Sequence, residues 1–406
     1  MTPPAGVDPA RRRELAPVAL AWLRRTGGRV GPDGRALGRV VGYFVVTRLA
    51  LFIVAACAIR LLPAPNQVRI EAYLGRNPSL TTWVRWDAWW YVSVIERGYW
   101  FDPEGQSNVA FFPVFPLLMR LVMTVVDNAV VAGLLLANVA ALAGVLAFWG
   151  WVRDAANAET ADRATRWLLV YPFSFFFHTI YAESTFFLFA TLALWAAGRR
   201  RWGWAGLCGL VAAGTRPLGV GLSVAFAWAI WSDRRRGAPL GAAPVAAILL
   251  PGVGLGAYLA YLWFAFGDPF AFWQAHVAGW KVHPDWSASA YWRGVHRAFT
   301  TLPRVESYVQ LLATLRLPLA ALAIALSVAA YRRLSPMAGL YSGLVVGVGI
   351  LFASDSLGRE LLAAPPAFAA AGLAAGDGAL AESLRLLSFC LLVIFLCAFA
   401  TGHFVS

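Results

Sequence analysis

One polar stretch interrupts an otherwise hydrophobic sequence between Thr81 and Pro116. Its charged residues are surrounded by Trp and Tyr side chains, and they are Arg85, Asp87, Glu96, Arg97, Asp102 and Glu104. A carboxylate at a membrane surface can take a proton from a hydroxyl group, and nearby cations can stabilise a phosphate that leaves. We therefore expect an active-site loop in which Asp87 is the catalytic group, either as general base or as the group that orients a hydroxyl.

Further polar residues occur where other hydrophobic runs end. Ionisable side chains at membrane depth are costly, so they act as functional groups or as ion-pair partners. Arginine suits phosphate because its planar guanidinium donates two parallel hydrogen bonds. The candidates for binding phosphate are Arg85, Arg216, Arg359 and Lys281. The remaining candidates for binding substrate are Glu183, Tyr181, Trp90 and Tyr91.

Plainer structural roles are open for the same residues. Asp87 can form a salt bridge with Arg85, and Glu183 can cap a helix or pair with Arg216. The Trp and Tyr residues can form the aromatic belt of a membrane interface. His178, His276, His283 and His296 are irregularly spaced, so we expect no metal site. The sequence has no Walker loop or dinucleotide fingerprint, and we expect no nucleotide and no cofactor.

The composition is that of a membrane protein. Of 406 residues, 60% are hydrophobic and only 14% are charged, and the mean hydropathy is +0.63, which excludes an ordinary soluble domain. The net charge of +13 comes from short basic clusters between apolar runs, as the positive-inside rule describes. We therefore expect membrane lipids as partners and no nucleic acid.

The hydrophobic runs predict an all-α, polytopic bundle. Residues 1–36 form a basic tail, and residues 37–406 form one transmembrane domain with about eleven spans. The first external loop covers 63–127 and the second covers 267–308.

The position of residues 109–126 decides the orientation of this bundle. These residues are apolar enough to span, but we interpret them as an interfacial helix, because only then do the later arginine clusters share one side. Those clusters are Arg199–Arg201, Arg234–Arg236, and Arg332 with Arg333. The prediction is a multi-pass protein of the cell membrane with a cytoplasmic N-terminus and an extracytoplasmic active site.

Several blocks together resemble the PIG-V family of mannosyltransferases. They are RWDAWWY at Arg85–Tyr91, FFPVFP at Phe111–Pro116, YPFSFFFHTIYAES at Tyr171–Ser184, and TRPLG at Thr215–Gly219. The resemblance implies a GT-C fold, an extracytoplasmic site, no nucleotide and no metal. It also implies a polyprenyl- or dolichyl-phosphate-mannose donor and inversion at the sugar. The family's catalytic acid in the first external loop corresponds to Asp87.

The chain departs from the family pattern at two places. Pro217 and Leu218 stand where the family often has a polar pair, and Glu360 follows Arg359 where it often has Tyr. These differences bear on the acceptor, which can be a protein, a glycolipid or a cell-wall polymer.

The predicted function is an inverting transferase that moves mannose from polyprenyl-phosphate mannose to an extracytoplasmic acceptor. One alternative is a GT-C enzyme for another lipid-linked sugar. Another is a lipid or sugar transporter or flippase, which would spread its charged residues through the central spans rather than gather them at one face.

Overall fold

The computed structural model describes most of the chain after the basic tail. The described residues are 32–62, 80, 82–280, 282, 296, 300, 308–352 and 356–405. Lys281, a candidate for binding phosphate, lies outside them, as does the predicted tail up to residue 31. All regular secondary structure in these described residues is helical, which confirms the predicted all-α class.

Some of the described helices are long and apolar enough to cross a membrane. They are α2 (Pro32–Leu61), α7 (Ala129–Ala155), α12 (Ala242–Phe266), α15 (Tyr308–Arg333) and α19 (Ala379–Ala400). A helix rises about 1.5 Å per residue, so about 20 residues match the roughly 30 Å hydrocarbon core of a bilayer. A multi-pass membrane protein is confirmed, while the number of eleven spans stays a prediction.

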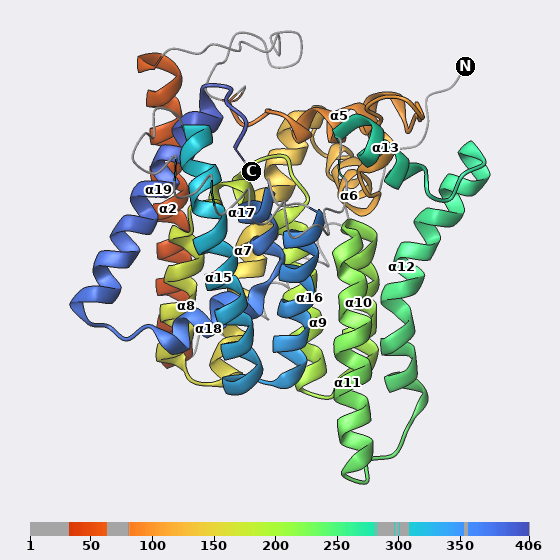
Figure 1. Cartoon of the computed structure of the whole chain (residues 1–406), viewed down its shortest axis with the longest axis vertical. Helices are drawn as coiled ribbons and strands as arrows, with labels where there is room; N and C mark the ends of the chain where they lie inside the picture. Colours follow the sequence, from red (N-terminus) through yellow and green to blue (C-terminus); the bar gives the residue numbers. More distant parts are fainter. Residues whose placement is uncertain are drawn as a thin grey trace, which may run out of the picture.

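Shorter helices complete the bundle (Figure 1). They are α8 (Ala158–Val170), α9 (Glu183–Gly198), α10 (Trp202–Thr215), α11 (Gly221–Arg235), α16 (Pro336–Phe352) and α18 (Pro365–Ala374). The chain turns between α10 and α11 through η3 (Pro217–Val220). At Gly219 in this turn a Cβ atom would lie 2.4 Å from the backbone nitrogen of Ala213, so only glycine allows this close approach.

Three short helices lie at one end of the bundle (Figure 1): α5 (Asp87–Arg97), α6 (Val114–Met123) and α13 (Ala271–Trp280). The ten residues of α6 rise about 15 Å, about half of the hydrocarbon core. This length agrees with an interfacial helix, and the boundaries of the external loops stay predictions. The segment before α6 is pinned by a short turn, η1 (Asn108–Ala110), whose Val109 carbonyl accepts a hydrogen bond of 2.7 Å from the Tyr258 hydroxyl of α12.

The order of the helices places the candidate residues at the end opposite to the arginine clusters. Helix α9 begins at Glu183 and runs toward Arg199–Arg201, and α10 returns to Arg216. Helix α15 ends at Arg333, and α16 returns toward Arg359 in the short helix α17 (Leu357–Glu360). One end of the bundle therefore collects the polar residues that the sequence singles out.

Candidate active site

Charged side chains from distant parts of the chain form one cluster, which we call the charged cluster: Asp87, Glu183, Arg216, Arg359 and Glu360. Arg359 Nη1 lies 2.5 Å from Asp87 Oδ2, and its Nε lies 3.4 Å from Glu183 Oε1. Arg216 donates from Nη1 to Glu183 Oε1 at 3.1 Å and from Nη2 to Glu360 Oε1. Three carboxylates face two guanidinium groups, so the cluster carries a formal net charge of −1.

Local structure explains how these residues reach the cluster. Asp87 and Glu183 are the first residues of α5 and α9, where the helix dipole favours a negative charge. Arg216 is extended, with φ −152° and ψ 142°, because the following Pro217 excludes the helical conformation and ends α10. Pro217, a departure from the family pattern, thus directs Arg216 out of the helix and toward the carboxylates.

Asp87 is held by its backbone as well as by its side chain. Its N–H donates to the Tyr181 hydroxyl at 3.1 Å, and that hydroxyl donates to the Arg85 carbonyl at 3.1 Å. Burial and the nearby Asp87 carboxylate raise the pKa of the Tyr181 hydroxyl, so it stays protonated. Trp86, between them, adopts φ 53° and ψ −112°, a conformation that is strained for a bulky residue. Backbone strain of this kind clusters at functional sites.

The Arg85 side chain does not join the charged cluster. Its Nη2 donates to the Ala400 carbonyl at the end of α19, at 3.1 Å, and not to Asp87. Next to it, Trp86 Nε1 donates to the His403 carbonyl at 3.3 Å, and the Trp86 ring packs edge-on against Phe404. Arg85 and Trp86 therefore anchor the Asp87 loop to the end of α19 and the residues just after it, and the salt bridge between Arg85 and Asp87 is not formed.

The aromatic candidates build a wall beside the cluster. Trp90 stacks on Phe111 with ring centroids 6.0 Å apart and meets Trp280 of α13 edge-on at 5.4 Å. Tyr91 is buried, and its ring meets Phe111 and Phe115 edge-on. Burial raises the pKa of the Tyr91 hydroxyl, and the carboxylates of Glu183 and Asp87 raise it further. Tyr91 thus faces the charged cluster, whereas Trp90 packs among aromatic rings.

Three residues with roles in this region were not among the sequence candidates. Glu360 closes the charged cluster, and His276 of α13 interacts electrostatically with Asp87 and Glu360. The buried Asn108 side chain accepts from Trp100 N at 2.8 Å and donates to the Gly98 carbonyl at 2.9 Å. Glu360 follows a candidate directly, which is the one signal that the sequence offered. The sequence places His276 among the polar residues of the predicted second external loop, whereas nothing in it singles out Asn108.

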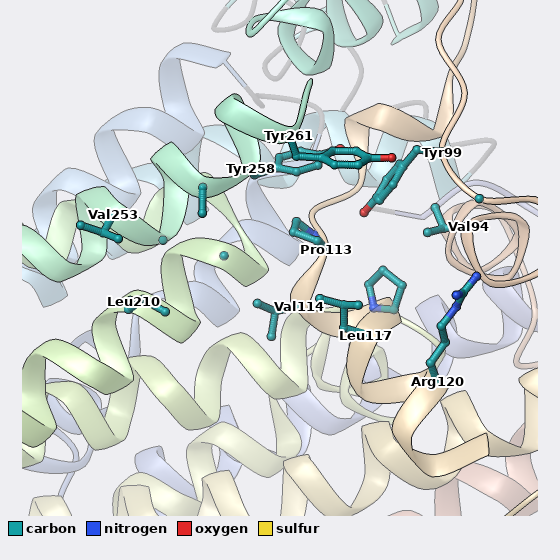
Figure 2. Close-up of a pocket in the computed structure, with 15 residues that line it drawn as sticks. Val94, Tyr99, Pro113, Val114, Leu117, Arg120, Leu210, Val253, Tyr258 and Tyr261 are labelled. Carbon is teal, nitrogen blue, oxygen red and sulfur yellow. The ribbon is translucent and has the colours of Figure 1, made fainter. Parts of the chain in front are cut away.

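An apolar groove lies between helices of the bundle (Figure 2). It has a volume of about 590 Å³ and lies between α5, α6, α10 and α12. Val114, Leu117 and Leu210 line it, and Arg120 stands at its edge, where Nη2 donates to the Ile95 carbonyl at 3.0 Å. Gly214 in its wall lies two residues before Arg216 in the sequence. Its chemistry suits a hydrocarbon chain.

The structure offers no ready metal site within the residues that it describes. No group of three or more His, Cys, Asp or Glu side chains there is placed to hold a metal ion. The described histidines have other neighbours: His178 Nδ1 contacts the Asn138 side chain, and His276 Nδ1 lies 2.8 Å from the Phe272 carbonyl. His283 lies outside the described residues.

We expect Tyr181→Phe to reduce the turnover number about tenfold. The hydroxyl bridges the Arg85 carbonyl and the Asp87 N–H, and leaving such buried groups unsatisfied costs about 1–3 kcal/mol. Part of that cost appears as misplacement of Asp87, and about 1.4 kcal/mol in the barrier is a factor of ten in rate. The measurement is kcat for sugar transfer in purified membranes. Tyr331→Phe is the matched control and should leave kcat unchanged. Tyr331 lies in the last turn of α15, beside Arg332 and Arg333 and at the end of the bundle opposite to Asp87.

The sequence comparison gives the family. Residues 38–225 match the model of a family described as mannosyltransferase (PIG-V). This family match covers a little under half of the chain. The PIG-V match includes Asp87, Tyr181, Glu183 and Arg216, while Arg359 and Glu360 lie beyond it. No curated protein matches the chain by sequence.

The structural comparison gives the fold. The chain is similar to ArnT from Cupriavidus metallidurans, in a structure bound to undecaprenyl phosphate, with a TM-score of 0.51 and 16% identity over 89% of this chain and 64% of ArnT. The chain thus spans less than two thirds of the length of ArnT. An oligosaccharyltransferase from Archaeoglobus fulgidus matches with a TM-score of 0.44 and 12% identity over 89% of this chain and 56% of that one. The likeness to ArnT confirms the GT-C type of bundle expected from the PIG-V resemblance.

Proposed function

We propose that the protein is an inverting glycosyltransferase that moves a mannosyl residue from polyprenyl-phosphate mannose to an extracytoplasmic acceptor. The observation that carries this proposal is the position of Asp87. Its carboxylate is fixed by Arg359 in a cluster with a second arginine, Arg216, and Gly214, two residues before Arg216, lines an apolar groove. The match of residues 38–225 to a mannosyltransferase family supports the choice of sugar.

The chemistry needs a hydroxyl, a base and a stabilised leaving group. The acceptor oxygen attacks C1 of the sugar, and the bond from C1 to the phosphate oxygen breaks on the opposite face, which inverts the configuration. Asp87 binds the acceptor hydroxyl and either takes its proton as general base or orients it for attack. The guanidinium groups of Arg216 and Arg359 stabilise the charge that develops on the phosphate. The reaction requires no nucleotide.

A lipid-linked donor agrees with the apolar groove. An isoprenoid chain is a hydrocarbon, and burying each Å² of its surface contributes about 25 cal/mol. The groove is lined almost wholly by apolar side chains and approaches Arg216 through Gly214. ArnT, which has a similar fold, holds undecaprenyl phosphate in its structure. We infer that the donor's lipid lies along this groove, with its phosphate toward Arg216 and Arg359.

The arginine clusters support the orientation in the membrane. Arg199–Arg201 and Arg234–Arg236 follow helices that lead away from the charged cluster, and Arg332 with Arg333 ends α15. By the positive-inside rule these clusters face the cytoplasm, which puts Asp87 and the donor phosphate outside.

The alternatives make different demands on the chain. A transporter would carry its charged residues along central spans, whereas the charged cluster gathers at one end of the bundle. Arg48, buried within α2, is an exception, and its Nη1 donates to the Ser174 carbonyl at 3.2 Å. A GT-C enzyme for another lipid-linked sugar fits the cluster equally well, so the sugar rests on the PIG-V match.

The test supplies radiolabelled polyprenyl-phosphate mannose to membranes that contain the protein. We expect a labelled mannoside that does not form in membranes with Asp87→Asn, and unlabelled polyprenyl-phosphate glucose should not compete. Transfer of glucose in place of mannose would overturn the choice of sugar. Movement of labelled lipid across sealed vesicles without any transfer would overturn the enzyme and favour the transporter.

A further inference from the structure

The imidazole of His276 has a defined protonation pattern. Its Nδ1 lies 2.8 Å from the Phe272 carbonyl, one turn earlier on α13. A carbonyl oxygen only accepts hydrogen bonds, so Nδ1 must carry a proton and donate it. In the neutral ring Nε2 then holds a lone pair. Among the described residues, no hydrogen-bond donor occupies that lone pair.

Helix α13 is fixed against the loop that carries Asp87. Gln106 donates from Nε2 to the Gly279 carbonyl at 3.3 Å, and a Cβ atom at Gly279 would come within 2.6 Å of the Gln106 Cα. Trp280 of α13 packs edge-on against Trp90 and Phe111, and the His276 ring lies 5.9 Å from the Trp280 ring. The imidazole is therefore part of the aromatic wall beside the charged cluster.

Charged groups on several elements shift the pKa of the His276 imidazole. Burial lowers the pKa of the imidazole, and Arg216 lowers it further. The hydrogen bond to Phe272 raises this pKa, as do the carboxylates of Asp87 on α5 and Glu360 on α17. The net effect is a pKa below the usual 6.5. The ring is then neutral at pH 7 and available as a base. The Asp87 carboxylate, by contrast, already has Oδ2 bound by Arg359 at 2.5 Å.

We propose that His276 is a second catalytic residue, which takes the proton of the acceptor hydroxyl through Nε2 while Asp87 orients that hydroxyl. This inference rests on the proposed function. As the acceptor O–H bond breaks, an N–H bond forms on Nε2, the acceptor oxygen bonds to C1 of the sugar, and the bond from C1 to the phosphate oxygen breaks. The electron pair stays on the phosphate.

The charges in this step balance. The donor is a phosphodiester of charge −1, and the product is a lipid phosphate that gains one negative charge when the bond breaks. The imidazole gains one positive charge in the same step. The imidazolium then offsets the new phosphate charge in a cluster whose own net charge is −1. A carboxylate base that took the same proton would change the charge of the cluster by the same +1.

The test is His276→Asn, measured as kcat, KM for the donor and their pH dependence. The asparagine amide can still donate to the Phe272 carbonyl, but it has no group that replaces the basic Nε2. We expect kcat to fall by roughly 10²- to 10⁴-fold with little change in KM. The wild-type kcat should fall as the pH drops below the pKa of His276, because the protonated ring cannot accept a proton. This acidic limb should be absent in the variant.

The exposed histidine in the same part of the chain, His296, provides the control. His296→Asn should keep the wild-type kcat and pH profile. His276→Gln serves as a second variant, and the thermal unfolding of both in detergent shows whether they fold as wild type. A wild-type kcat and an unchanged acidic limb in a folded His276 variant would overturn the role. Inactive wild-type membranes would instead count against the proposed function.

Discussion

Asp87→Asn is expected to reduce sugar transfer from a polyprenyl-phosphate donor by roughly 10²- to 10⁴-fold, with an unchanged amount of protein in the membrane. The carboxylate of Asp87 binds Arg359 Nη1 at 2.5 Å and starts α5, where the helix dipole favours its charge. The amide of Asn has nearly the same shape but no charge. The asparagine amide cannot hold the acceptor hydroxyl as strongly. Arg359 would then have Glu183 as its remaining carboxylate partner.

The same measurement separates a catalytic role from a structural one. A catalytic Asp87 predicts loss of kcat in a protein that still elutes as a single species in detergent. Asp102→Asn is the matched control, since Asp102 lies on the same loop, is exposed, and accepts a hydrogen bond from the Glu104 N–H that an asparagine oxygen can also accept. Full transfer by Asp87→Asn would rule out the proposed mechanism. Equal losses in both variants would point to damage to the loop.

Arg216→Met is expected to be the most destabilising single change in the charged cluster. Arg216 is nearly buried, with 14% of its side chain exposed, and it pairs with Glu183 and with Glu360. Removing one partner of a buried ion pair typically costs about 3–5 kcal/mol, because it leaves uncompensated charge in a low dielectric. Here two carboxylates would be left with Arg359 as the nearby cation. The change should lower the temperature of thermal unfolding in detergent and abolish transfer.

An exposed ion pair supplies the comparison for Arg216. Arg39 lies 2.8 Å from Asp162, with 53% of the Arg39 side chain exposed, and such surface pairs contribute only about 0.2–1 kcal/mol. Arg39→Met should therefore leave the unfolding temperature almost unchanged. Arg216→Lys should be intermediate, since one ammonium group cannot reproduce the planar fork that reaches two carboxylates. An unfolding temperature of Arg216→Met equal to that of wild type would contradict the structural part of its role.

The two changes together distinguish the parts of the site. Asp87→Asn keeps the cluster assembled and removes the group that contacts the acceptor. Arg216→Met removes the cation that joins α9, the turn after α10 and α17. For Asp87→Asn, the geometry predicts loss of activity with normal stability. For Arg216→Met, it predicts loss of both activity and stability.

The sequence by itself determined the class of the protein and predicted the loop that carries Asp87 as the site of its chemistry. Apolar runs long enough to span a bilayer allow only helices there, because backbone groups in hydrocarbon must satisfy one another. Asp87 stood out because a carboxylate among Trp residues at a membrane surface is costly unless it is used. The PIG-V resemblance over Arg85–Tyr91 and Tyr171–Ser184 came from adjacent residues, which a sequence displays directly.

Only the tertiary structure decided which charges meet. Arg85 is two residues from Asp87, but its guanidinium donates to Ala400, whereas Arg359, far along the chain, binds Asp87. Pairing between side chains depends on the directions in which their helices end, and the φ and ψ angles of Trp86 turn Arg85 and Asp87 apart. His276 joined the site for the same reason, because the packing of α13 on Gln106 is a contact between segments that no local pattern encodes.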